Sequence, residues 1–430
     1  MAFRVQEVST KQQEQQWLDV ARTVYRDDPT WVCPLDGEIK GVFDPKKNTY
    51  FDGGEAARWL LLDGSGQAVG RIAAFYNNRR ANKFDVPTGG VGFFECINNQ
   101  EGAHMLFDTG RNWLQARGLE AMDGPVNFGE NHMHWGLLVE GFTAPGLGMP
   151  YNPLYYKDLL ESYGFELYFT QYSKHMDMAK SLPERFLKIA DWVAQKKGVE
   201  VCHARKKELK KFGEDFRTIY NDAWRHHEHF TEITPAMMQE QIKMLDLLLV
   251  EEFLIFAYVN GDPAGFIVCL PDLNQIIKPF RGKPSIWQLL LLMWRKRNGF
   301  KWYRDRGILT RGRVIIMGVR RRYQQYGIES AMMKHGMEHI PKLGFQEMEL
   351  SWVGDFNPKM RAVLEQTGGH DAKLHYTYRY YFDPAKRGQR STIITVNSKE
   401  ADLKERTGQS AKPEPTEPES AEPTAPSADV

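Results

Sequence analysis

A basic, glycine-containing turn lies between two apolar stretches in the second half of the chain. Residues 314–319 are apolar and rich in β-branched side chains, which is typical of a buried strand, and residues 328–340 carry apolar side chains at a helical spacing. Between them stand three arginines, two glutamines and Gly327. The first N–H groups of a helix lack partners within the helix, and its dipole favours an anion there. The turn therefore has the chemistry of a phosphate site, although a solvated arginine run would have the same composition.

Histidine could also do chemistry in this chain, because it exchanges protons near neutral pH and binds transition metals. Histidines gather at residues 132–134 and again at residues 226–229, where Glu228 stands between His227 and His229. Neither group has the HExxH spacing that places two ligands on one helix face, so we predict no metal site. The second group is a candidate set of proton acceptors, with ordinary surface or core histidines as the alternative.

The elements that must position the turn follow a recognisable order. A strand is predicted at residues 345–353, where apolar and polar side chains alternate. Asn357 and Pro358 then have the residue types of a helix N-cap and first helical position, and a tyrosine-rich strand is predicted at residues 373–382. The order strand, turn, helix, strand, helix, strand resembles the C-terminal half of the GNAT (Gcn5-related N-acetyltransferase) superfamily.

In that superfamily the turn, written Gln/Arg-x-x-Gly-x-Gly/Ala, holds the pyrophosphate of acyl-coenzyme A. Gln324 and Gly327 match this pattern, whereas Glu329 places a carboxylate where the superfamily has a small residue. The resemblance implies acyl-CoA as the co-substrate, without a metal. It also implies that the coenzyme is bound by Gly318, Val319, Arg320, Arg322, Gln324, Gly327 and Ile328.

The resemblance further implies that a bound amine attacks the thioester directly, so the protein must position both reactants and move a proton. The superfamily often donates a proton from a tyrosine in the helix after Asn357, and that helix carries no tyrosine here. Tyr376 and Tyr378, on the next strand, are the candidate replacements, and Glu349 is a candidate base. Core aromatic residues and a solvated carboxylate are the alternative interpretations. The candidate catalytic group is Glu349, Asn357, Tyr376 and Tyr378.

Length and composition limit the remaining choices. The chain has 430 residues and a net charge of +1, so it has room for two or three domains, and its charge gives no support for a polyanionic partner. Four cysteines without CxxC spacing indicate a reducing compartment. An apolar leader is not visible, and no apolar run reaches the roughly 18 residues that a spanning helix needs. We therefore expect a cytoplasmic protein.

Repeated spacing indicates that the fold is duplicated. Asn152 and Asn357 each precede a proline, and each is followed by a leucine after seven residues and a glycine after twelve. We predict an α/β (α+β) protein with two tandem GNAT-like domains, each a mixed sheet flanked by helices, at residues 1–180 and 181–382. Residues 383–430 are rich in Pro and Glu and are predicted to form a disordered tail. The first domain has no basic Gly-x-Gly turn, so we predict a structural or acceptor-binding role for it.

Residues 278–306 combine nine Lys or Arg residues and one Asp with several aromatic side chains. The apolar run at residues 286–294 is far too short to span a bilayer. Aromatic and basic residues beside a short apolar run indicate peripheral contact with the inner membrane face or with a lipid substrate. A buried helix flanked by solvated charge is the alternative. Bases could stack on such a segment, but no recognised motif supports a nucleic-acid partner.

Longer segments narrow the resemblance. GPVNF at residues 124–128, GVRRRYQQYGI at residues 318–328 and ELSWVGDFNPKM at residues 349–360 resemble a bacterial family of tandem GNAT-like proteins. That family includes ceramide-synthase-type acyltransferases, which N-acylate a sphingoid base. Its pattern has Asn-Trp-Gly-Phe where this chain has His-Glu-His-Phe, and the change falls on the expected acceptor pocket. The residues so assigned to acceptor binding are His227, Glu228 and His229.

The sequence thus predicts an acyl-CoA-dependent N-acyltransferase that acts on a small-molecule or lipid amine. Two alternatives stay open. Tandem GNAT-like domains also build aminoacyl-tRNA-dependent transferases. Glu329 and the missing helix tyrosine would also suit a binding protein that keeps the fold without catalysis.

Overall fold

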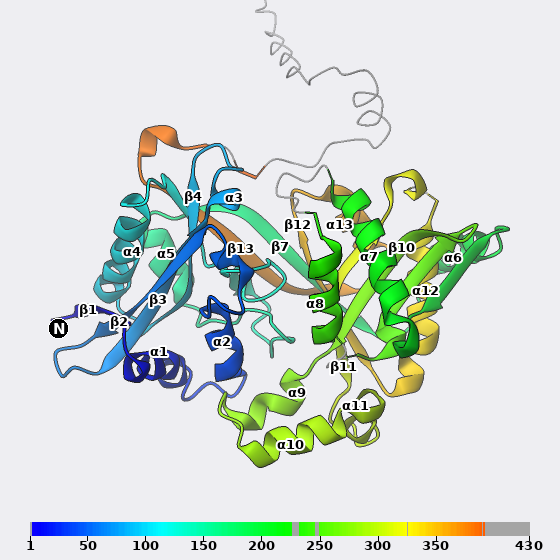
Figure 1. Cartoon of the computed structure of the whole chain (residues 1–430), viewed down its shortest axis with the longest axis horizontal. Coiled ribbons are helices and arrows are strands. Elements are labelled where there is room, and N and C mark those ends of the chain that lie inside the picture. Colours follow the sequence, from blue (N-terminus) through cyan, green and yellow to red (C-terminus); the bar gives the residue numbers. More distant parts are fainter. Residues whose placement is uncertain (1, 226–231, 246–248, 325, 389, 392–430) are drawn as a thin grey trace, which may run out of the picture. The chain divides into compact units, whose positions relative to one another are not determined.

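The computed structural model describes residues 2–225, 232–245, 249–324, 326–388, 390 and 391. The predicted acceptor residues His227, Glu228 and His229 lie outside these ranges, as does the predicted tail beyond residue 391. The described strands form one mixed sheet of thirteen strands (Figure 1). In order across the sheet, the first six are β1 (Arg4–Glu7), β2 (Gly54–Leu62), β3 (Ala68–Asn77), β4 (Thr88–Cys96), β5 (Ala121–Gly124) and β13 (His370–Tyr381). The sheet continues through β7 (Glu166–Asp177), β12 (Glu347–Gly354), β11 (Arg311–Val319), β10 (Asp262–Pro271), β9 (Leu254–Val259) and β8 (Val199–His203), while β6 (Leu137–Glu140) pairs with β13 beside this path.

Helices connect these strands and cover both faces of the sheet (Figure 1). Those of the first half are α1 (Lys11–Val24), α2 (Asp36–Val42), α3 (Asn78–Ala81), α4 (Gln100–Gln115) and α5 (Tyr156–Tyr163). Those that follow are α6 (Glu184–Ala194), α7 (Leu209–Trp224), α8 (Pro235–Leu245), α9 (Asn274–Ile277), α10 (Ile286–Arg295), α11 (Arg297–Arg304), α12 (Ile328–His339) and α13 (Pro358–Glu365).

Side chains alternate between the two faces of each strand, so alternate apolar residues pack against different helices. In β2 and β3, Leu61 and Ile72 belong to a buried cluster with α4 and α5. Their neighbours Leu60 and Ala73 belong to a cluster with α1 and α2 on the other face. Burial of both sets removes apolar surface from water and stabilises the layers.

The second half repeats this arrangement. Ile255 and Ile267, on β9 and β10, are buried in a cluster with α6 and α12. Phe256 and Phe266 point the other way, into a cluster with α7. The two halves therefore have the same layered construction, in which helices from one repeat cover each face of its own strands. This is the mixed α/β architecture that the sequence predicted.

Strand β13 does not remain among the strands of its own half. It lies between β5 and β7 and pairs antiparallel with both. Tyr378 of β13 is consequently buried in the cluster of the first half, while Met176 of β7 is buried with α6 and α12. The two halves share one sheet because each contributes a strand to the other.

Two asparagine–proline pairs behave differently, although their sequences look alike. The Asn357 side chain accepts a hydrogen bond from the first turn of α13, and Pro358 is its first residue, so that predicted helix start is confirmed. The sequence Asn152-Pro153 predicts a helix start in the same way, and there the prediction is wrong. The Asn152 side chain exchanges hydrogen bonds with the backbone of Leu138, and α5 begins only at Tyr156.

The folded part of the chain extends past residue 382, where we placed the start of the tail. Residues Pro384–Lys386 form a short 3-10 helix. Lys386 pairs with Glu120 at 2.8 Å, and Arg387 pairs with Glu166 at 2.9 Å. These contacts fasten the chain to the sheet after β13.

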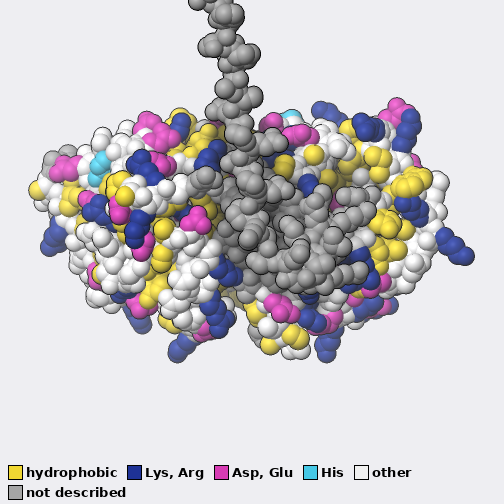
Figure 2. Space-filling view, turned by 90° about the horizontal axis from the view of Figure 1, so that it is seen from above, with side chains coloured by type: hydrophobic (Ala, Val, Ile, Leu, Met, Phe, Trp, Pro, Cys, Tyr) yellow, Lys and Arg dark blue, Asp and Glu magenta, His cyan; other side chains and the backbone are white. Residues whose placement is uncertain are grey.

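Charged side chains are mixed on the face seen in Figure 2. Lys and Arg side chains lie between Asp and Glu side chains around the described part of this face. This agrees with the net charge of +1 and does not suggest a polyanion-binding surface there.

Candidate functional site

Two pairs of neighbouring strands run parallel, β4 with β5 and β11 with β12, and a helix follows the first strand of each pair. Strands β11 and β12 pair as far as Val314 and Leu350, whereas β11 continues to Val319. Strands that separate leave N–H and C=O groups available to a ligand at their carboxyl ends. Ligands of open α/β sheets bind at this edge. The region between β11 and β12 can therefore receive an extended, amide-containing chain.

Gly327 is the N-cap of α12 and adopts a left-handed conformation with φ of 77°. The cap supplies no side-chain hydrogen bond to α12. The N–H of Ser330 already donates to the carbonyl of Gly327 at 3.1 Å, so an anion at this end would meet the N–H groups of Ile328 and Glu329. A Cβ atom at this position would lie 2.9 Å from a methyl carbon of Val193 and 3.0 Å from one of Ile189, both on α6. Glycine is thus required by conformation and by the close approach of α6.

The arginines of the turn are held by Asp262, at the corner between β9 and β10. Its carboxylate accepts hydrogen bonds from Tyr323 at 2.8 Å and Arg320 at 2.9 Å, and it also pairs with Arg322. Burial raises the pKa of Asp262, but the hydrogen bonds from Tyr323 and Arg322 outweigh burial and lower it. Arg320 and Arg322 therefore orient the turn, and a phosphate would meet them already in place.

The other residues assigned to the coenzyme lie along the same turn. Gln324 donates to the carbonyl of Val319 at 3.3 Å and closes the turn. Ile328 is buried in the core beneath α12. A Cβ at Gly318 would collide with the ring of Trp224, so the indole lies directly against the end of β11.

Glu329 lies in the first turn of α12, where we expected its charge to oppose a pyrophosphate. Burial raises the pKa of its carboxyl group. A hydrogen bond from the backbone N–H of Glu329 itself opposes this rise in its pKa.

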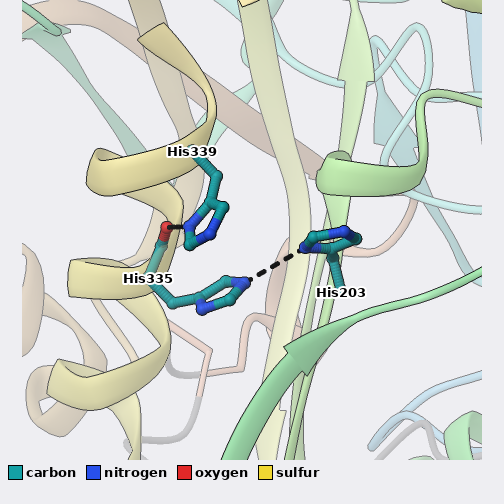
Figure 3. A group of neighbouring side chains, drawn as sticks. All are labelled: His203, His335 and His339. Atoms are coloured by element: carbon teal, nitrogen blue, oxygen red, sulfur yellow. Dashed lines mark hydrogen bonds between the residues drawn. The ribbon is translucent and has the colours of Figure 1, made fainter. Parts of the chain in front are cut away.

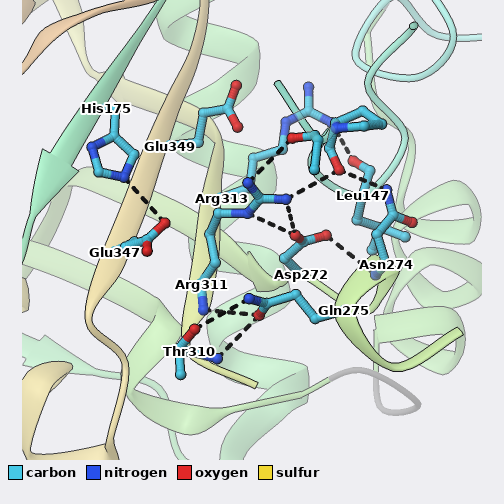
Figure 4. A network of polar contacts seen from close by, with 12 residues as sticks. Leu147, His175, Asp272, Asn274, Gln275, Thr310, Arg311, Arg313, Glu347 and Glu349 are labelled. Carbon is cyan, nitrogen blue, oxygen red and sulfur yellow. Dashed lines mark hydrogen bonds and ion pairs between the residues drawn. The ribbon is translucent and has the colours of Figure 1, made fainter. Parts of the chain in front are cut away.

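Glu349, the predicted base, lies in a buried polar network between the two halves (Figure 4). Both of its carboxylate oxygens accept hydrogen bonds from Lys373 of β13. Nearby, Arg313 donates to the carbonyl of His132 at 3.0 Å and also to that of Leu147, and burial lowers its pKa to about 10. Because Glu349 is already paired in the interior, its position favours a role in holding β12 and β13 together.

The other predicted catalytic residues lie apart from the turn. Asn357 is occupied as the N-cap of α13. Tyr378 is buried and donates to Glu161 of α5 at 2.9 Å, and Tyr376 packs beside it at the edge of the same cluster. Strands β7 and β12 separate β13 from β11, so the structure does not bring these tyrosines to the coenzyme turn.

A cavity of about 120 Å³ lies at the carboxyl end of β4, lined mostly by residues of the first half together with Asn274 and Ile277 of α9. Its apolar lining residues include Ile39, Phe94 and Leu147. Its polar lining residues include Glu95, Arg71, Tyr25, Tyr156, Glu38 and His134. An apolar pocket with a few convergent polar groups is the usual form of a small-molecule site.

Glu95 is the central polar group of this cavity. Tyr156 donates to one carboxylate oxygen at 2.8 Å, and Arg71 lies 3.4 Å from the other. Burial raises the pKa of Glu95 despite Arg71 and the tyrosine hydrogen bonds. A carboxylate with a raised pKa, open to a cavity, is suited to accept a proton.

Two of the residues that line the cavity have a strained backbone conformation. Phe93, beside Glu95, has φ of 50°, and His134 has φ of 49°. The imidazole of His134 lies 2.9 Å from the carboxylate of Glu38. Positive φ at residues other than glycine is costly and tends to occur where function requires it.

The sequence did not indicate this cavity, because the residues that line it are scattered along the chain from α1 to α9. One signal was present: Glu95 is a single carboxylate in the otherwise apolar run at residues 91–96. A charged side chain in a strand that is buried on both faces is costly, so it is expected to have either a partner or a function.

Comparisons with known proteins show what this chain is similar to. No family model matches the chain. The chain is 29% identical over 364 residues to a protein named bacterial ceramide synthase from Caulobacter vibrioides, covering 82% of this chain and 90% of that protein. It is 27% identical over 375 residues to protein YghO of Escherichia coli, covering 83% and 90%. Both similarities extend over most of this chain and most of the relative, so the likeness concerns the whole folded part and not a single motif.

Solved structures are similar to this chain in fold. A tandem GNAT protein from the clavulanic acid biosynthesis pathway superposes with a TM-score of 0.53 at 10% identity, covering 89% of this chain and 99% of that chain. The glucosamine N-acetyltransferase region of a fungal multi-domain β-N-acetylglucosaminidase gives a TM-score of 0.52 at 10% identity, covering 88% and 38%. The fold is therefore the tandem GNAT arrangement predicted from the order of the elements.

Proposed function

We propose that this protein is an acyl-CoA-dependent N-acyltransferase that transfers a fatty acyl group to the amine of a lipid. The observation that carries the donor half of this proposal is the uncapped N-terminus of α12 at Gly327, at the end where β11 and β12 separate. The helix end suits a pyrophosphate, and the open strand edge suits the amide-containing arm of coenzyme A. The relative named bacterial ceramide synthase supports a sphingoid-type amine as the acceptor.

The cavity around Glu95 is the proposed acceptor site. A lipid amine arrives as an ammonium ion, which the ionised carboxylate attracts. Glu95 removes one proton, and the free amine then attacks the thioester carbonyl. The new C–N bond forms, the C–S bond breaks, and coenzyme A leaves as a thiolate that takes up a proton.

One segment of chain connects the donor and acceptor regions. Residues 145–149 line the cavity, and the carbonyl of Leu147 accepts a hydrogen bond from Arg313 of β11. Six residues of extended strand separate Arg313 from Val319, a distance of about 20 Å. An extended coenzyme arm that begins at the turn and follows β11 would thus direct its thioester toward the cavity.

Helix α10 supports a lipid as the acceptor. Most of its apolar side chains are exposed, including Trp287 at 76% and Trp294 at 60%. Lys278, Arg281 and Lys283 precede it and are also exposed. Among the described helices, none is long and apolar enough to cross a membrane. We propose that α10 lies in the interface of an anionic bilayer, with its aromatic residues at headgroup depth and the flanking cations on anionic lipid.

The proposal is tested by product formation together with ligand-dependent stability. Purified protein is incubated with palmitoyl-CoA and a long-chain amino alcohol in phosphatidylglycerol-containing vesicles, and the amide is detected by mass spectrometry. We expect the amide together with equimolar free thiol. We also expect coenzyme A, acetyl-CoA and palmitoyl-CoA each to raise the melting temperature, since a ligand at 100 times its Kd adds about 2.7 kcal/mol to stability.

Two outcomes would contradict the proposal. Amide formation that requires charged tRNA in place of acyl-CoA would establish the aminoacyl-tRNA-dependent alternative. The absence of both a thermal shift and a product with any acyl-CoA would favour a binding protein that keeps the fold. A thermal shift with free coenzyme A but no product from the long-chain amine would confirm the donor site and refute the lipid acceptor.

A further inference from the structure

Three imidazoles converge on the outer side of the second half, away from the residues that line the cavity. His335 and His339 stand one turn apart on α12, and His203 is the last residue of the edge strand β8 (Figure 3). One ligand nitrogen of each ring lies within 4.8 Å of those of the other two, and all three side chains are partly buried. His335 and His339 have the i, i+4 spacing of one helix face, but His203 precedes them by 132 residues or more, so the sequence does not show that the three meet.

The spacing of the rings matches the geometry of a tetrahedral metal site. Zinc binds imidazole nitrogen at about 2.0–2.1 Å, which places two ligand atoms of a tetrahedron about 3.3–3.4 Å apart. The Nδ1 atom of His203 lies 3.3 Å from the Nε2 atom of His335. Without a metal, these two nitrogens must share one proton, and a cation would replace that proton with a bond to each ring.

The third ring is oriented as a ligand. His339 donates through Nδ1 to the backbone carbonyl of His335 at 2.8 Å, which leaves the lone pair of its Nε2 free. A hydrogen bond from the other ring nitrogen to a carbonyl is the usual way in which proteins fix the tautomer of a metal-bound histidine. Its ring is stacked on that of His335, with centroids 4.1 Å apart.

The charged side chain next to the cluster on α12 pairs with carboxylates. The nearest lysine on the helix, Lys334, is turned to Asp191 and Glu338, with which it pairs at 2.9 Å. No carboxylate belongs to the cluster in the described chain. Three imidazoles suit zinc, nickel, copper or cobalt and not the oxygen-preferring magnesium or calcium.

We propose that His203, His335 and His339 bind a divalent transition-metal cation of the zinc class, with water in the fourth position. Such an ion would fasten the edge strand β8 to α12, the helix whose first turn begins at Gly327. Its role is structural, since the three ligands lie outside the residues of the proposed acceptor cavity. The inference does not depend on the acyl-transfer proposal, because it rests on these three side chains alone.

Metal content and cobalt spectroscopy test the site directly. The full chain is purified without a polyhistidine tag, treated with EDTA, dialysed, and then supplied with Zn²⁺ or Co²⁺, with Mg²⁺ as a negative control. We expect one bound Zn²⁺ per chain, a higher melting temperature with Zn²⁺ but not Mg²⁺, and the intense visible absorption of four-coordinate Co²⁺. The single variants His335→Gln and His339→Gln should each weaken zinc binding at least about tenfold.

A matched control separates this site from general histidine affinity. His104 is a histidine of the first half that contacts Ser162 at 3.0 Å, so His104→Gln should bind zinc as the wild type does. Each variant is compared with the wild type in EDTA, where equal melting temperatures show that the fold is intact. Zinc binding that is unchanged in both ligand variants, or Co²⁺ that keeps the pale spectrum of the hydrated ion, would overturn the proposal. A wild-type chain that binds no zinc at micromolar concentration would do so as well.

Discussion

The ammonium nitrogen of Lys373 lies 3.0 and 3.2 Å from the two carboxylate oxygens of Glu349, and the side chains are only 3% and 2% exposed. The pair joins β13 to β12, which lie on either side of β7. The pair thus holds β13, which lies beside a strand of the first half, to β12 of the second half. A buried pair of this kind is costly to break, because the remaining charge has no partner in a medium of low polarity.

We predict that Lys373→Met destabilises the fold by about 3–5 kcal/mol, because it leaves the Glu349 carboxylate buried and unpaired. The double variant Glu349→Gln with Lys373→Met should recover much of that loss. Chemical denaturation measures both. The control is Lys174→Met, which removes the neighbouring pair with Asp371, a carboxylate that is 79% exposed. That change should cost less than about 1 kcal/mol. Equal losses at Lys373 and Lys174 would contradict the structural role of the buried pair.

The sequence predicted the second half well because its signals are local. Alternation identified the strands, Asn357 and Pro358 marked a helix start, and Gly327 marked the turn. The exchange of β13 left no such signal. The sequence of β13 predicts a strand but does not show beside which half that strand lies. Only the pairing of Tyr378 with Gly124 of β5 shows its place in the sheet.

Glu95 should act in catalysis more than in stability. Burial raises the pKa of its carboxyl group above the ordinary glutamate value of about 4.3. As a base it works when ionised, so kcat/KM should rise with pH through this raised pKa. A raised folded-state pKa also means that the fold favours the protonated form, and this contribution to stability is lost as pH rises through that value. We therefore predict that Glu95→Gln lowers kcat by about 100-fold or more while stability at neutral pH is kept or increased.

Two readouts decide this prediction. The pH profile of Glu95→Gln should lose its acidic limb, and the amide product should fall with no loss of melting temperature. Glu101→Gln, an exposed carboxylate in the first turn of α4, is the control and should leave the profile unchanged. A Glu95→Gln variant with full activity would remove Glu95 from the mechanism and leave it as the partner of Arg71.

The cavity is a feature of the fold that the sequence alone does not predict. Its polar groups come from α1, α2, β3, β4 and α5, and they meet only because β3 and β4 are neighbours and the loop after β6 folds over them. Spacing along the chain carries no information about such a meeting. Glu349 is the converse case: it has the residue type and strand position of a base, and only the structure shows that it pairs with Lys373.

Gly327→Ala should impair donor binding beyond its effect on stability. A side chain in the left-handed conformation costs about 1–2 kcal/mol, and the Cβ would also press against Val193 and Ile189 of α6. Gly344→Ala is the matched control, because Gly344 is also left-handed, with φ of 91°, while its Cβ would lie 3.7 Å from the backbone oxygen of Arg304, an ordinary van der Waals contact. We expect both variants to melt lower, and only Gly327→Ala to lose most of its thermal shift with coenzyme A. Equal coenzyme shifts in the two variants would place the donor elsewhere.

Helix α10 should bind anionic bilayers through its exposed apolar side chains. Replacing both Trp287 and Leu290 with Ser removes side chains whose burial contributes about 1.5–3 kcal/mol each, so binding to phosphatidylglycerol vesicles should weaken at least tenfold in a sedimentation assay. Trp192→Ser is the control, since Trp192 on α6 is also 60% exposed but lies outside the basic segment. High salt should weaken binding of the wild type, because the cations flanking α10 contribute about 1 kcal/mol each near an anionic surface. If the double variant instead converts a dimer to a monomer and leaves vesicle binding unchanged, α10 is a contact between two copies of this chain. Activity on a short, water-soluble amine should survive the double variant, which separates loss of membrane contact from loss of catalysis.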